Sequence, residues 1–302
     1  MDELRAACAA VAARSGHVVI VAESLAAYAA SLPDNPLPTD PQDELLEGTP
    51  EQQAAFWLTL DAINFGSGWF PTLRKPPGRS GYSTIAGGMR ARANELGPWS
   101  ARELTRISTE ELAGVLEQDP RHPLLELFAV SLRVLGEHLV TEHGGSFLTL
   151  ASSTRGSAVA LARHLGALST FADTSQYDGI EVSFLKRAQI AAADLARAGL
   201  IDAPDLRGLT MFADNLVPHV LRLDGVLRFE PGLVARIEAE ELIEHGSPEE
   251  VEIRACAVHA VELIVAERAD TCAAQVDQLL WQRGQGRRYK VSPRHRSRCL
   301  AY

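Results

Sequence analysis

This chain has few cysteines, no long apolar runs and no excess of positive charge. Each of these features excludes a class of protein. The four cysteines, Cys8, Cys256, Cys272 and Cys299, are widely separated, so no spacing resembles a zinc site, an iron–sulfur site or a disulfide framework. Reduced thiols in the cytosol are the simplest interpretation. No apolar stretch approaches a membrane span, and the first fifteen residues lack the continuous apolar core of a secretory signal. We therefore expect a cytoplasmic protein that does not contact the membrane.

The charge balance argues against a general nucleic-acid-binding protein. Lys and Arg number 29 against 39 Asp and Glu, which gives a net charge of −10. Neutralising a phosphate backbone requires clustered cations, but a small anionic ligand needs only a few local ones. With 302 residues the chain can bury a sizeable core, and we expect a single domain over residues 1–302 with a basic tail at about 284–302. The oligomeric state is left open.

Helical patterns dominate the chain, so we expect a mainly α fold with a few short strands. Ser108 with Glu111 and Ser247 with Glu250 have the spacing of capping boxes. The strip HVVIVAES is either a strand or a helix start, and Asp178-Gly179 predicts a turn before a short strand. The helices are expected at 3–14, 50–63, 84–96, 109–117, 123–142, 157–168, 185–198, 248–267 and 271–283, and surface loops at 31–50 and 72–82.

Asp214 is the most informative residue, because it stands in the apolar run LTMFADNLVPHVL. A carboxylate is costly to bury unless hydrogen bonds satisfy it. The residues from Asn215 onward read as a helix, with Pro218 in its first turn and Gly225 past its end, so Asp214 is a candidate N-cap. The free amides and the helix dipole would keep it ionised. Such a carboxylate suits stabilisation of an oxocarbenium-like sugar, although a plain structural cap is the alternative.

The order of a helix at 185–198, a tight loop at 199–208 and a capped Asp214 is similar to the layout of helix–hairpin–helix N-glycosylases. In that layout an Asp caps a helix beside a sugar pocket, and a polar residue often comes from the helix before the hairpin. Lys186 and Arg187 are placed to serve in this way, although helix–loop–helix units are common.

Several longer segments are more specific than any single short motif. They are INFGSGWF (63–70), FADTSQYDGIEVSFLKRAQIAAADL (171–195), LTMFADNLVPHVLRLDGVL (209–227), EVEIRACAVHAVELI (250–264) and HRSRCLAY (295–302). Together they resemble the queuosine salvage protein family, whose members are queuosine 5′-phosphate N-glycosylases, and the resemblance runs in order from about residue 15 to the last residue. It implies hydrolysis of the bond between ribose 5-phosphate and queuine, a 7-deazaguanine base, for reuse in tRNA. It also implies a helical fold related to DNA glycosylases, and no metal or organic cofactor.

Under this resemblance Asp214 is the catalytic residue, as nucleophile, transition-state stabiliser or base for water. A 7-deazaguanine has carbon where purines have N7, so the departing base must be stabilised through its pyrimidinone edge. That requires a carboxylate that accepts from ring N–H groups, for which Asp173 and Asp178 are candidates. Asp173 is preferred, because Asp178 precedes Gly179 and fits a turn. Asn215 could reach the ribose or the base.

The remaining substrate contacts follow from residue chemistry. Stacking of the base would use aromatic rings, a charged phosphate would use cations, and each of these residues also has an ordinary structural interpretation as core, solvated face or satisfied histidine. The candidates are Phe65, Trp69, Phe171 and Tyr177 for stacking, Asn64 and Ser67 for polar contacts, Lys186 and Arg187 for the phosphate, His219 for phosphate or sugar, and His17 to close the pocket.

Two further features invite a structural interpretation. Arg254 and Glu262 lie on one apolar helix and suggest a buried ion pair. The tail would ordinarily be solvated, whereas the resemblance implies that its end docks on the domain, although Leu300-Ala301 replaces the paired aromatics of the family ending. The alternatives are a DNA base-excision glycosylase and a non-catalytic helical protein that binds nucleotide or tRNA. We expect a small nucleotide as partner and no stable nucleic-acid complex.

Overall fold

The computed structural model describes residues 1–34, 46–268 and 270–302, and helices make up most of them. Most of the loop expected at 31–50 lies outside the described residues. The α-helices are α1 (Asp2–Ala12), α2 (Leu25–Ser31), α3 (Pro50–Ala62), α4 (Gly81–Leu96), α5 (Ala101–Leu104), α6 (Thr109–Leu116), α7 (Pro123–Glu142), α8 (Phe147–Ser152), α9 (Ala158–Gly166), α10 (Lys186–Arg197), α11 (Val217–Leu223), α12 (Pro231–Glu238), α13 (Pro248–Ala266), α14 (Ala273–Arg283) and α15 (Arg287–Lys290). The mainly α prediction is confirmed.

Helix starts follow the capping signals, with two corrections. Thr49 and Gln52 form a reciprocal capping box at the start of α3, with Pro50 as its first residue. The boxes predicted at Ser108 and Ser247 are only half formed: each serine accepts from the expected amide, but the glutamate side chain turns elsewhere. Glu111 accepts from the Trp99 indole N–H at 2.6 Å, and Glu250 enters a buried ion pair. Glu111 is thus drawn to a residue outside its helix, whereas Glu250 is held by Arg254 one turn along the same helix.

The strands form two small antiparallel pairs. β2 (Thr174–Tyr177) and β3 (Ile180–Ser183) make a hairpin whose two-residue turn is Asp178-Gly179, with φ of 46° and 77°. Positive φ at both positions is the type I′ geometry that fits the twist of a hairpin. β1 (Val18–Ile20) pairs with β4 (Leu227–Phe229), which resolves the ambiguous strip HVVIVAES as a strand.

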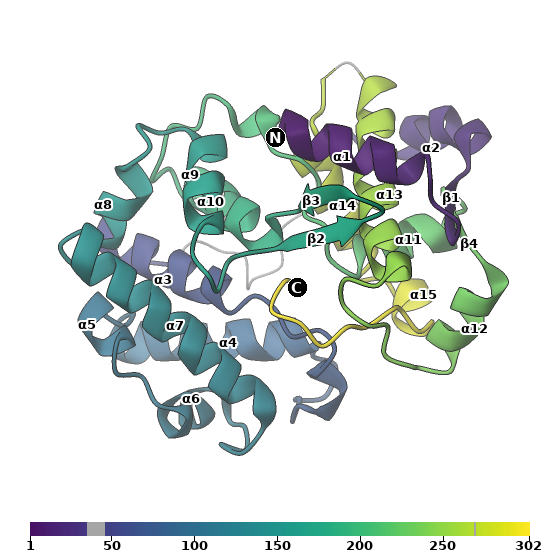
Figure 1. Cartoon of the computed structure of the whole chain (residues 1–302). Coiled ribbons are helices and arrows are strands. Elements are labelled where there is room, and N and C mark those ends of the chain that lie inside the picture. Colours follow the sequence, from purple (N-terminus) through teal and green to yellow (C-terminus); the bar gives the residue numbers. More distant parts are fainter. Residues whose placement is uncertain (35–45, 269) are drawn as a thin grey trace.

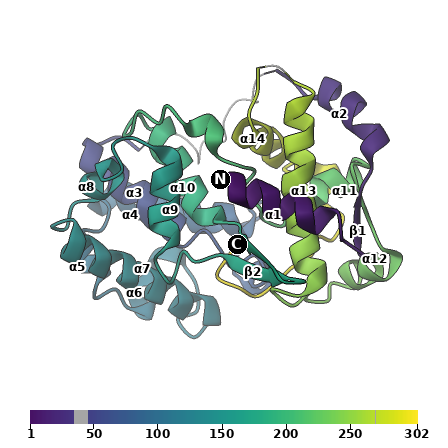
Figure 2. The same cartoon turned by 45° about the horizontal axis from the view of Figure 1, so that its top comes forward.

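The helices gather into two groups that both views separate (Figures 1 and 2). One group holds α3 to α10, and the other holds α1, α2 and α11 to α15 around the long α13. Helix α10 packs on α9 and α3, whereas α13 packs on α1. The β2–β3 hairpin lies between the groups. Among the described residues, no helix combines the length and apolarity needed to cross a bilayer.

The C-terminal tail docks on the domain, so the interpretation as a solvated tail is wrong. The carbonyl of Tyr302 accepts from the amides of Gly66 and Ser67 at 2.9 and 3.4 Å, and its side chain is buried. Gly68 is needed here, because a Cβ would come within 2.4 Å of the Ser297 carbonyl. The tail thereby runs from the second group of helices back to the segment that follows α3 (Figure 1).

Candidate active site

The site is built at the N-terminus of α10, which the chain enters through Leu185 in a left-handed conformation. The Oδ2 atom of Asp173 accepts from the Lys186 amide at 3.0 Å and from Arg254 Nη2 at 2.7 Å. Sequence reasoning placed Asp173 against the base. In the structure one oxygen of Asp173 links the first residue of α10 to Arg254, which belongs to the second group of helices.

Lys186 is buried, which differs from the solvated helix face that was its structural alternative. Its Nζ donates to the backbone carbonyl of Asn64 at 2.9 Å and to the Asn64 side-chain oxygen at 3.2 Å. Burial lowers the pKa of Lys186 to about 8, although Asp214 opposes the shift, as do Asp61 and Asp277. Lys186 is therefore the cation at the centre of an acidic cluster.

Asp214 is held by backbone amides, as the sequence predicted, but Leu216 and not Asp214 is the N-cap of α11. Its Oδ1 accepts from the amides of Leu216 at 2.8 Å and Val217 at 3.0 Å. The helix itself begins at Val217, two residues later than expected. The Oδ2 atom makes no hydrogen bond to any part of the chain that the structure describes. The half-buried carboxylate thus has one fixed oxygen and one available oxygen.

Two acids that sequence reasoning missed join this cluster. Asp277 on α14 is buried, and its Oδ1 accepts from the Phe212 amide at 3.0 Å. Burial, followed by the charge of Asp214, raises the pKa of Asp277 well above its usual range. Burial also raises the pKa of Asp61, the acid in the last turn of α3. Each stands in an apolar helical run, FWLTLDAI or AAQVDQLLW, which is the signal that singled out Asp214.

Arg294 on the docked tail is the second cation of the site. Burial lowers its pKa, and Asp214 is the charge that opposes this most strongly. Among residues 1–34, 46–268 and 270–302 its guanidinium has no hydrogen-bond partner. Asn64, Asp214 and Arg294 are half-buried while Lys186 and Asp277 are buried, so the first three mark the side of the cluster that solvent reaches.

Arg187 forms a separate structural unit with Phe65 and Phe171, two of the four rings predicted to stack on the base. The guanidinium lies 4.7 Å from the ring centre of Phe65 and 5.0 Å from that of Phe171. It donates to the carbonyls of Ala62 and Thr170, and burial lowers its pKa to about 10. Both rings therefore lie against a buried cation within the core. Trp69 instead faces Arg298 of the tail.

Three predicted residues gather near Glu252 and the β2–β3 hairpin, with no contact to Asp214 among the described interactions. The Tyr177 hydroxyl donates to Glu252 Oε1 at 2.9 Å, and the His17 amide donates to Glu252 Oε2 at 2.6 Å. Asp178 is exposed at the hairpin turn and pairs with Arg14 at 3.3 Å. The turn interpretation of Asp178 is confirmed.

Three other predicted site residues, Asn215, Ser67 and His219, bind the C-terminal tail. The Asn215 side chain donates to the His295 carbonyl at 3.1 Å, and the Ser67 amide donates to Tyr302. His219 Nε2 lies 3.0 Å from the Tyr289 carbonyl, and burial lowers the pKa of His219 to about 4, so the ring is neutral. Asn64, Lys186 and Asp214 are thus the predicted residues that the structure brings together, with Asp173 supporting them.

The buried ion pair predicted between Arg254 and Glu262 is wrong in its partners. Arg254 pairs with Asp173 at 2.7 Å and Glu250 at 3.5 Å, whereas Glu262 pairs with Arg5 at 3.0 Å. Two residues eight positions apart on a helix are more than two turns apart, too far for a direct pair. The aromatic rings of Phe184 and Tyr302 also lie against the Arg254 guanidinium.

A surface hollow of about 320 Å³ lies elsewhere, beside α1, α9 and β3. Its lining includes Glu3, Arg163 and Glu181 but no member of the Asp214 cluster. We base the site on the cluster because it joins an amide-held carboxylate, a lysine of lowered pKa and a carboxyl of raised pKa, the combination expected of acid–base chemistry.

A buried acid–base cluster on a helical framework is the class of site that the geometry defines. Comparison with known proteins gives the family: residues 45–302 match the queuosine salvage protein family, and the chain belongs to it. A relative from Sphaerobacter thermophilus, named queuosine 5′-phosphate N-glycosylase/hydrolase, is 36% identical over 83% of this chain and 82% of its own length. Relatives of the same name from Bos taurus and Dictyostelium discoideum are each 30% identical, over 74% and 83% of this chain and 72% and 79% of their own lengths.

Proposed function

We propose that this protein hydrolyses the N-glycosidic bond of queuosine 5′-monophosphate, releasing queuine and ribose 5-phosphate so that queuine can be reused in tRNA. Membership of the family supports the substrate, and one observation carries the chemistry: Asp214 offers a free oxygen from a carboxylate that two amides hold in place. The protein would act in the cytoplasm on a free nucleotide, without a cofactor in the reaction.

Asp214 would stabilise the positive charge that develops at the anomeric carbon as the bond breaks. A fixed carboxylate does this without reorganising during the reaction, which is why such groups lower the barrier. Its free Oδ2 would either contact the sugar or orient the attacking water. Lys186 and Asn64, joined by hydrogen bonds of 2.9 and 3.2 Å, would keep this charge balanced and the cluster rigid.

Asp277 would supply the proton that the departing base needs. The raised pKa favours the protonated form of its carboxyl, beside an acid that must be ionised. Since Oδ1 accepts from the Phe212 amide, Oδ2 would carry the proton. A proton donor at the carbonyl of the pyrimidinone edge would stabilise a departing base that has no N7 to protonate. This role is separate from the acceptor role expected for Asp173.

Arg294 is our proposed contact for the 5′-phosphate. A guanidinium binds phosphate through paired N–H groups, and that of Arg294 has no hydrogen-bond partner among the described residues. The position of Arg294 on the solvent-facing side of the cluster supports entry of a charged group there. We further infer that α10, the loop after it and α11 correspond to the helix–hairpin–helix unit of DNA glycosylases.

Product analysis tests the function directly. Purified protein without added metal is incubated with queuosine 5′-monophosphate, with queuosine and with guanosine 5′-monophosphate, and the bases are measured by mass spectrometry. We expect queuine from the 5′-phosphate and no guanine. Release from no queuosine substrate would reject the proposal and favour a nucleotide-binding or tRNA-binding protein.

The pH dependence should report Lys186. Below about pH 8 the ammonium is charged and balances the acids around it; above that pH the charge is lost. We expect kcat/KM to fall as the pH rises through about 8, by about tenfold per further pH unit if the charged form is required. Lys186→Arg keeps its charge throughout this range, so a folded variant should lose this decline. An unchanged decline would assign it to another group.

A further inference from the structure

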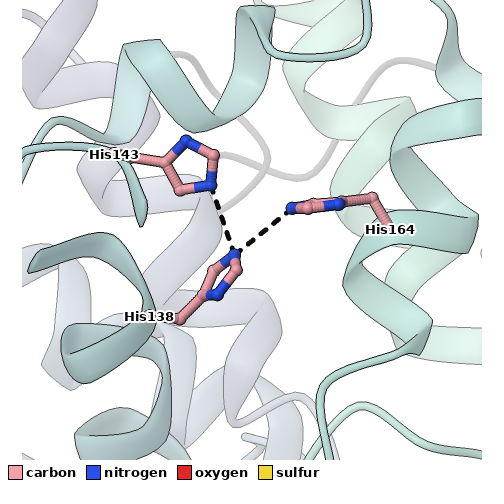
Figure 3. Close-up of side chains that lie close together, drawn as sticks. All are labelled: His138, His143 and His164. Carbon is pink, nitrogen blue, oxygen red and sulfur yellow. Dashed lines mark hydrogen bonds between the residues drawn. The ribbon is translucent and has the colours of Figure 1, made fainter. Parts of the chain in front are cut away.

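Three histidines converge at a place that the reaction does not use. His138 lies in the last turns of α7, His143 caps the end of that helix, and His164 lies near the end of α9. Figure 3 shows the three rings pointing toward one another. The Nε2 atom of His138 lies 3.2 Å from Nε2 of His164 and 3.2 Å from Nε2 of His143.

Hydrogen bonds between the rings cannot satisfy this arrangement fully. A neutral imidazole nitrogen carries either one proton or one lone pair, so Nε2 of His138 can serve only one of its two neighbours well. Protonating the rings would bring positive charges together.

The spacing matches that of ligands around one metal ion. Zinc–nitrogen bonds of about 2.05 Å at tetrahedral angles place two ligand nitrogens about 3.3 Å apart. Both short separations are 3.2 Å, and all three nitrogens lie within 4.8 Å of one another. The rings are half-buried, so solvent can supply a fourth ligand, and the negative charge of the exposed Glu142 acts on both His138 and His143.

We propose that His138, His143 and His164 form a binding site for one late first-row divalent metal ion, with zinc as its physiological occupant and a water molecule as the fourth ligand. Three imidazoles suit zinc, copper, nickel and cobalt rather than magnesium or calcium. The ion would join the end of α7 to α9. Because α9 packs on α10, the clamp supports the helix that carries Lys186 and does not itself take part in the reaction.

Cobalt(II) is the probe, because its visible spectrum reports coordination by nitrogen. Chelator-treated protein without a histidine tag is titrated with Co²⁺ and then with Zn²⁺, and its thermal unfolding is followed. We expect one equivalent of Co²⁺ with the intense bands of a four-coordinate site, displacement by zinc, and a higher Tm with either metal. His138→Gln should weaken binding at least about a hundredfold, since even residues behind a ligand cost 10- to 100-fold.

His259→Gln is the matched control, because this half-buried histidine lies on α13, outside the cluster, and should leave binding unchanged. His164→Gln tests the same site from the other helix if His138→Gln does not fold. Equal cobalt affinity in wild type and either folded cluster variant would overturn the proposal, as would the absence of a stoichiometric site in wild type. Retained glycosidase activity after chelation would support a structural role for the ion, and a loss that metal restores would overturn that role.

Discussion

Replacing Asp214 with asparagine should lower kcat/KM for queuosine 5′-monophosphate by about a hundred- to a thousandfold, which corresponds to roughly 3–4 kcal/mol of transition-state stabilisation. Asparagine keeps an oxygen that can accept from the amides of Leu216 and Val217, so the local structure should persist. As helix caps the two residues are nearly equivalent, and stability should change by less than about 1 kcal/mol. The charge is what the substitution removes.

A matched control separates charge from capping. Asp205 also accepts from backbone amides, those of Ala158 and Val159 at the start of α9, at 2.8 and 3.3 Å. Because Asp205 accepts through both oxygens and also binds the Ser157 hydroxyl, Asp205→Asn should lose more stability than Asp214→Asn and yet retain activity. Initial rates and thermal melts of both variants provide the test. Full activity in Asp214→Asn would mean that this carboxylate is a structural cap and that the chemistry resides elsewhere.

Replacing Arg254 with methionine should destabilise the protein by about 3–5 kcal/mol, the largest expected loss of stability. The Arg254 side chain is 0% exposed, as is that of Glu250, and that of Asp173 is 1% exposed. Burial opposes the charged guanidinium, but the two carboxylates outweigh it and raise the pKa of Arg254, while Arg254 helps to hold that of Glu250 at about 2. Methionine would fill the space but leave the buried Asp173 without its ion-pair partner and Glu250 with His245 alone.

Arg236→Met is the control for that measurement. Arg236 also pairs with two carboxylates, Glu241 and Glu249, but its side chain is 40% exposed. Water screens such pairs, so the loss should stay below about 1 kcal/mol. Urea unfolding at neutral pH gives both values. Similar losses for the two variants would show that the buried triad contributes no more than a surface pair.

The sequence predicted those parts of the molecule that depend on local signals. The longer helices α3, α4, α7, α10, α13 and α14 were predicted from their caps and apolar content, whereas α12 was missed. The amide bonds to Asp214 follow from its apolar run and Pro218, although Leu216 is the N-cap. Short elements such as α5 and β4 have too few residues for a period to show. The capping boxes at Ser108 and Ser247 failed because other groups engage the glutamates: the Trp99 indole N–H binds Glu111, and Arg254, one turn further along the same helix, pairs with Glu250.

The candidate site could be predicted only in part, because its geometry is tertiary. Lys186 and Asn64 were chosen for their chemistry, but their mutual hydrogen bond depends on how α10 packs against α3. Phe65 and Phe171 were expected to stack on a base, and only the fold reveals that Arg187 lies against both rings. Asp277 would have been found by applying to every acid in an apolar run the reasoning given to Asp214.

The docking of the tail bears on when the site can form during folding. Gly66 and Ser67 bond to Tyr302, and Asn215 bonds to His295, so residues far apart in the chain must meet before the acidic cluster is enclosed. Contacts between distant segments form slowly, because closing a long loop costs entropy before any contact compensates for it. The helices around α7 can therefore assemble early, and glycosidase activity should recover later than helical structure when the denatured protein refolds.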